Sequence, residues 1–254
     1  MDRSQRHLAA ELAGTILGCV LVSAALAIIW VARSTVQRDL YVSELGAVGE
    51  PTAGWFRVAL LLVVVGGSLI ALAARDIRSA APILRLWTPA VSLWVGCGFF
   101  FVASQVTCTA DCPLPVGPTF TWQDFAHTTV AVLAFSAACW AMLQASFMRD
   151  NRMLAAVSLA CGCAVACVAG AGGILSLARF QAVLGSRLEL VATTVAIGWL
   201  VLLGAFLAAR LLRELVPRDA GSGRYGRLIA TRTGIPREPS GGGAVGQVEA
   251  GGSG

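Results

Sequence analysis

Six apolar runs, each of about 20 residues or more, dominate the chain and limit the folds open to it. They lie near 11–32, 55–74, 87–106, 125–147, 154–177 and 189–209. A helix of about 20 residues crosses the hydrocarbon core of a bilayer, and a helix satisfies its backbone polar groups within one segment. Only 13% of the 254 residues are charged, about half the share of a water-soluble domain. We therefore expect an all-α membrane protein with six transmembrane helices in one bundle.

The chain ends differ in composition from the apolar runs. The first run could be mistaken for a signal peptide, but its length and Glu11 at its start favour a retained anchor. The last residues, "SGGGAVGQVEAGGSG", are rich in glycine and typical of disorder. The sequence thus predicts a transmembrane domain over 1–212 and a disordered cytoplasmic tail over 213–254.

Arginines set the expected orientation. The sequence contains no lysine, and fourteen arginines fall on the side of the membrane that holds both termini. Four fall on the other side, or five with Arg57 at the mouth of the second run. The positive-inside rule therefore predicts a plasma-membrane protein with both termini in the cytoplasm. No basic stripe interleaves with aromatic residues, so we expect membrane lipids rather than nucleic acid as partners.

Two of the eight cysteines, Cys108 and Cys112, lie in the polar connection "TCTADCPLP" between the third and fourth runs. On the outer side of the membrane their spacing permits a small disulfide ring. Free thiols and a metal site remain open as alternatives. Further metal ligands are not evident nearby, so we expect no metal and no cofactor.

The stretch "ACGCAVACVAGAGG", residues 160–173, resembles a metal cluster only at first sight. Cysteine behaves as a small apolar residue. Gly162, Ala166 and Gly170 recur at the small-xxx-small spacing that lets helices approach closely. We interpret the stretch as a helix-packing face.

Polar residues collect at the expected outer ends of the helices and form a candidate binding or structural cluster. Its members are Ser43, Glu44, Arg57, Asp111, Asp124, His127, Arg187 and Glu189.

Within this cluster Asp124 and His127 are three residues apart and share one helix face. A carboxylate beside an imidazole can prepare a general base, so both are candidate catalytic residues. Thr121 and Asp124 also fit a capping box, which favours a structural network; a metal site is the third alternative. Glu44 with Arg57, and Arg187 with Glu189, are candidate ion pairs.

Two stretches carry a resemblance to a known family. "YVSELGAVGEP" after the first run and "DFAHTTVAVLAF" at the start of the fourth resemble the bacterial six-span membrane family catalogued as domain of unknown function 998. The resemblance covers about residues 10–210, and the cysteine pair departs from it. The resemblance implies that the first outer loop meets the start of the fourth span, which would bring Ser43, Glu44, Asp124 and His127 together. The connection "TCTADCPLP", which we call the cysteine loop, would then act as a lid over this cluster. The resemblance implies no activity.

Three classes of function remain. The chain has no GxSxG, HExxH or Walker motif, and no acid or arginine in the middle of a run. We therefore expect a non-enzymatic accessory or stabilising component of a cell-envelope or lipid-transport assembly, with membrane-protein partners. The alternatives are a lipid-modifying enzyme with an outer-leaflet Asp/His site and a small permease. The enzyme requires a lipid-accessible cavity at His127, and the permease requires a polar path between the two faces.

Overall fold

A computed structural model describes residues 3–110, 112–113, 118, 120–178 and 181–216. These residues form six α-helices and two short 3-10 helices, and none of them is in a strand. The α-helices are α1 (Arg3–Thr35), α2 (Ala53–Ala73), α3 (Pro89–Gln105), α4 (Trp122–Ser146), α5 (Arg152–Leu177) and α6 (Ala182–Leu215). The 3-10 helices are η1 (Ser43–Gly46) and η2 (Ile83–Arg85). The all-helical prediction is confirmed for this part of the chain.

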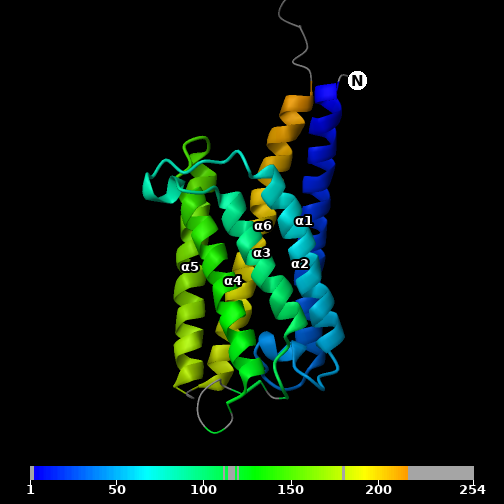
Figure 1. The fold of residues 1–254 in the computed structure, drawn as a ribbon, viewed down its shortest axis with the longest axis vertical. Helices are drawn as coiled ribbons and strands as arrows, with labels where there is room; N and C mark the ends of the chain where they lie inside the picture. The colour runs from blue at the N-terminus through cyan, green and yellow to red at the C-terminus, as the bar shows by residue number, and fades with distance from the viewer. Residues whose placement is uncertain (1–2, 111, 114–117, 119, 179–180, 217–254) are drawn as a thin grey trace, which may run out of the picture. The chain divides into compact units, whose positions relative to one another are not determined.

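The six helices form a closed ring within the unit that ends at Val216. Each helix packs against its neighbours in chain order, and α6 packs against α1. The start of α1 and the end of α6 lie at the upper end in Figure 1, as does η2. Residues 36–52 and the start of α4 lie at the lower end, which we call the cysteine-loop end.

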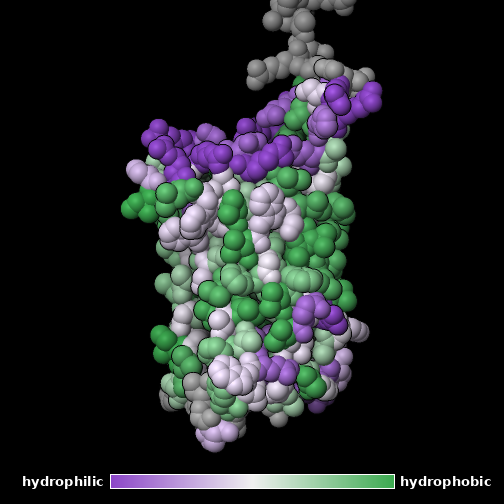
Figure 2. Space-filling model, in the orientation of Figure 1, coloured by the Kyte–Doolittle hydropathy of each residue, from purple (hydrophilic) through white to green (hydrophobic). Residues whose placement is uncertain are grey.

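The surface of the ring is that expected of a multi-pass membrane protein. Five helices are long and apolar enough to cross a membrane, and α3, with 17 residues, is shorter. Figure 2 shows a polar band across the upper end and a largely apolar belt below it. Large apolar side chains stand outside the bundle, with Trp122 77% and Met153 78% exposed. Lipid is the solvent that such a surface fits.

Helix α6 extends beyond the predicted run at both ends. It starts at Ala182 instead of near 189 and continues to Leu215, past the predicted domain boundary at 212. Hydropathy marks only the apolar part of a helix, whereas arginine and glutamate are themselves good helix formers. Arg187 and Glu189 therefore lie inside α6 and not in a loop. The predicted disordered tail, from 217 onward, lies outside the described residues.

Glycines bring the backbones of α1 and α2 into contact. A Cβ on Gly18 would lie 2.8 Å from the carbonyl oxygen of Gly66, and a Cβ on Gly66 would lie 2.7 Å from that of Gly18. Close small-residue crossings of this kind hold helices together in lipid, where apolar burial gives no driving force between helices. The contact between Gly18 and Gly66 therefore holds α1 against α2 on one side of the ring.

We predict that Gly66→Ala destabilises the bundle by about 1–3 kcal/mol, because the added methyl group forces two backbones apart. Denaturant unfolding in detergent measures the change. The control is Gly54→Ala in the same helix, where a Cβ meets no atom within 4 Å; this variant should be neutral or slightly stabilising. Equal effects in both variants would contradict the role of the crossing.

Candidate functional site

Asp124 holds the cysteine loop against the start of α4. The Thr109 N–H and hydroxyl groups donate to its two carboxylate oxygens at 2.8 and 2.9 Å. The Thr121 hydroxyl also donates to it, and Thr121 Oγ1 accepts the Asp124 N–H as the helix cap. In the predicted capping box the carboxylate would accept the backbone N–H of Thr121. In the structure it instead accepts from Thr109 of the cysteine loop and from the Thr121 hydroxyl. With three donors bound, Asp124 has a structural role.

The cysteine loop is closed by a disulfide between Cys108 and Cys112. The first loop lies against it, because the Val48 N–H donates to the Cys108 carbonyl at 3.0 Å and the Ser43 carbonyl oxygen lies 3.7 Å from the Cys108 sulfur. A His127 ring nitrogen is within 4.8 Å of both sulfurs. The disulfide uses both sulfurs, so this trio offers no thiolate pair for a metal.

His127 is oriented by the backbone and not by Asp124. Its Nδ1 lies 2.6 Å from the Val106 carbonyl oxygen. A carbonyl oxygen only accepts, so Nδ1 carries the proton and Nε2 of the neutral ring offers a lone pair. Nε2 is buried and has no hydrogen-bond partner. The ring thus holds an acceptor that the described residues do not use.

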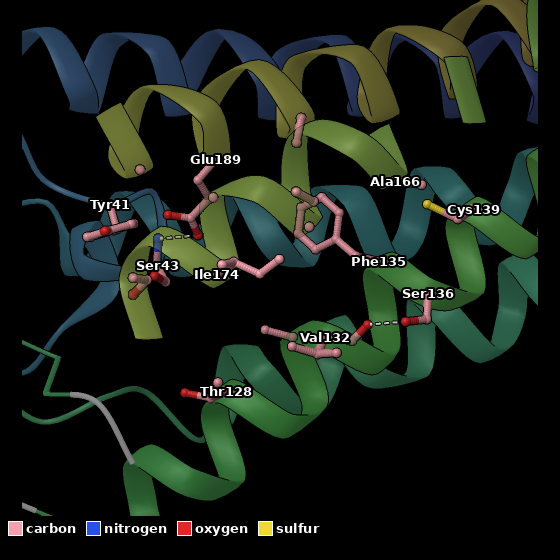
Figure 3. A pocket seen from close by; sticks show the side chains of 18 of the residues that line it. Tyr41, Ser43, Thr128, Val132, Phe135, Ser136, Cys139, Ala166, Ile174 and Glu189 are labelled. Carbon is pink, nitrogen blue, oxygen red and sulfur yellow. Dashed lines mark hydrogen bonds between the residues drawn. The ribbon is translucent and has the colours of Figure 1, made fainter. Parts of the chain in front are cut away.

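Glu189 joins α6 to the first loop. Its carboxylate accepts the Val42 N–H at 2.8 Å and the Ser43 N–H at 3.3 Å, which caps the start of η1. Figure 3 shows Glu189 reaching toward Ser43. Glu189 therefore bonds backbone groups about 146 residues earlier in the chain and not Arg187, which is exposed.

A cavity of about 1220 Å³ lies between α4, α5 and α6. Tyr41, Ser43, Glu44, His127 and Glu189 line its cysteine-loop end. The rest of its wall is mostly apolar. Figure 3 shows the side chains that line it, from α4, α5, α6 and the first loop. The site is therefore a long apolar chamber with one polar end.

The small-residue face of α5 is only partly a packing face. Gly162 faces Met142 of α4, and a Cβ there would lie 3.2 Å from that side chain; Gly172 faces Leu188 of α6 at 3.4 Å. Gly170 and Gly173, in contrast, would meet no atom within 4 Å, and both line the cavity. The prediction of close packing along the whole stretch is therefore wrong, because α4 is not close to the later part of the face.

Arg57, Glu44 and Asp111 are the remaining predicted residues. Arg57 donates to Gln105 Oε1 of α3 at 2.8 Å, and the predicted pair with Glu44 is not among the described ion pairs. Glu44 accepts the Tyr41 N–H at 2.8 Å within its own loop. Asp111 lies outside the described residues.

Sequence reasoning missed the cavity, although one signal was available on α6. Gly185, Glu189 and Ala192 follow one another at i, i+4 and i+7 and share a helix face. Small residues above and below an acid on one face leave room for another group beside it. All three line the cavity.

Comparisons with models of protein families, with curated proteins and with solved structures find no match for this chain. The resemblance to the six-span family therefore stays a prediction.

We predict that Asp124→Ala lowers the free energy of unfolding by about 1–3 kcal/mol, because it leaves the Thr109 donors without an acceptor. It should also speed reduction of the Cys108–Cys112 disulfide by a soluble phosphine, since Cys108 is fully buried in the wild type. Mass spectrometry of alkylated thiols follows the reduction. Gln123→Ala, which removes only an exposed bond to the Thr107 carbonyl, is the control. Unchanged reduction in Asp124→Ala would contradict the assigned role.

Proposed function

We propose that the chain is a six-span plasma-membrane protein that binds one amphiphilic lipid in the cavity between α4 and α5. In this proposal it serves as a non-enzymatic component of a lipid-handling or cell-envelope assembly. The observation that carries the proposal is the cavity itself, with one polar end and mostly apolar walls. A membrane lipid has the same division between headgroup and chain.

The length of the cavity supports a lipid chain as the occupant. On α4 the lining runs from His127 to Leu143. At a rise of 1.5 Å per residue this is about 24 Å, most of the roughly 30 Å thickness of the hydrocarbon core. Its volume also exceeds the 300–1,000 Å³ that is usual for small-molecule pockets.

The cavity is open to the side of the bundle. Val132 of α4 and Ile174 of α5 both line it and are 58% and 68% exposed. Toward the 147–151 connection, Met142 packs against Gly162 and the two helices are in contact. A lipid can thus enter sideways between α4 and α5 without leaving the hydrocarbon.

We predict that Gly170→Phe abolishes lipid retention by the purified protein. Gly170 lines the cavity and has open space where its side chain would begin, so the ring can fill the cavity without displacing backbone. Native mass spectrometry of protein extracted in mild detergent measures the retained lipid. We expect a loss of at least about tenfold relative to the wild type, which corresponds to 1.4 kcal/mol.

The matched control is Gly98→Phe. Gly98 lies on α3, is exposed and also has open space at its Cβ, but it does not line the cavity. This variant should retain lipid as the wild type does. Equal loss in both variants, or no lipid on the wild type, would contradict the proposal.

One observation favours a second candidate, a lipid-modifying enzyme. In its neutral form the His127 ring has an unpartnered Nε2 lone pair, which a general base requires. Asp124 is bound to the cysteine loop, so this enzyme would use the Val106 carbonyl to orient the ring. A lipid product that forms with the wild type and not with His127→Gln would favour this candidate.

We predict that both chain ends face the cytoplasm and that α3 crosses the membrane. Alkaline phosphatase fused after residue 113 should be active in a bacterial host, whereas the same enzyme fused after residue 216 should be inactive. A fluorescent protein at these positions should give the reverse pattern. Active phosphatase at both positions would contradict the orientation.

A further inference from the structure

We propose that the cavity selects an amphiphile whose headgroup donates hydrogen bonds and carries no net negative charge. The inference rests on the proposed function and names the class of lipid. It comes from the charges and hydrogen-bond acceptors at the polar end of the cavity.

The first observation is the charge of the polar end. Glu44 and Glu189 both line it. Among the described lining residues there is no arginine, and His127 is the single basic side chain. An anionic phosphate usually requires arginine, lysine or a cluster of N–H donors.

The second observation is that Glu189 can accept a further donor. A carboxylate has about four acceptor sites. The N–H groups of Val42 and Ser43 use two of them. Glu189 remains partly exposed within the cavity. A hydroxyl or ammonium group of a ligand would complete its hydrogen bonding.

The third observation is independent of Glu189. His127 lines the same cavity and has 4% of its surface exposed. Its Nδ1 donates to the Val106 carbonyl, so in the neutral ring the unpartnered Nε2 is an acceptor. Two side chains on different helices, α4 and α6, therefore lie at the polar end of one cavity, and each can accept a hydrogen bond from a ligand.

The charge of the headgroup then distinguishes anionic lipids from lipids without a net negative charge. Like charges brought together in a binding site cost several kcal/mol, and buried charges are screened little by salt. An anionic headgroup beside the ionised form of Glu189 meets this repulsion. A diacylglycerol hydroxyl or a phosphatidylethanolamine ammonium group instead donates to the carboxylate.

The test is a competition on the purified full chain. Native mass spectrometry follows binding from an equimolar mixture of four lipids with identical acyl chains: diacylglycerol, phosphatidylethanolamine, phosphatidylglycerol and phosphatidic acid. We expect the first two to be bound at least about tenfold over the last two. Binding of diacylglycerol would show that the site accepts a hydroxyl donor, and binding of phosphatidylethanolamine would show that it accepts an ammonium donor.

A variant that removes the negative charge of Glu189 tests whether this residue causes the selectivity. Glu189→Gln keeps an oxygen that can accept the Val42 and Ser43 N–H groups and removes the negative charge. The preference over phosphatidylglycerol should fall by about tenfold or more in this variant. Glu214→Gln is the matched control, because Glu214 lies on the same helix, is exposed and does not line the cavity; it should leave the preference unchanged.

The outcomes separate the two proposals. Equal or better binding of the anionic lipids by the wild type would overturn this inference and leave lipid binding intact. Failure of the wild type to bind any of the four would overturn the proposed function itself. An unchanged preference in folded Glu189→Gln would also overturn the inference. If that variant does not fold, the wild-type competition decides alone.

Discussion

The lack of water in the hydrocarbon core governs how this bundle treats its polar side chains. A polar group there needs a partner from the chain itself, since an unsatisfied group costs several kcal/mol. Gln144, fully buried, accepts from the Ser92 hydroxyl and donates to the Leu84 and Trp87 carbonyl groups, which holds the η2 connection against α4. Each such bond also fixes how two parts of the chain meet.

Two buried polar atoms among the described residues lack such a partner. Among the described residues, the buried side-chain polar atoms without a partner are His127 Nε2 and Trp140 Nε1, and both residues line the large cavity. Proteins often break a folding rule, such as the pairing of buried polar groups, at their functional sites. The same cavity holds Glu189, an acid with no basic neighbour among its described bonds. These polar groups therefore all lie along one cavity, which is why we assign binding there.

The two sides of the ring use small residues for opposite purposes. Between α1 and α2, Gly18 and Gly66 bring the backbones into contact. On α5, Gly170 and Gly173 face open space. The contact on one side holds α1 against α2, and the space on the other is part of the cavity between α4, α5 and α6.

The sequence alone determined that the chain is helical and approximately where each helix lies, and it indicated a membrane protein, because apolar length and low charge depend on composition along the chain. It also predicted the Cys108–Cys112 bond and the Thr121 cap, since both partners lie within a few residues of each other. Tertiary structure alone decided which glycines pack and which line a cavity, because the answer depends on the distance to another helix. It also decided that Glu189 binds the backbone at Val42 and Ser43, a contact between residues far apart in the chain that no local pattern encodes.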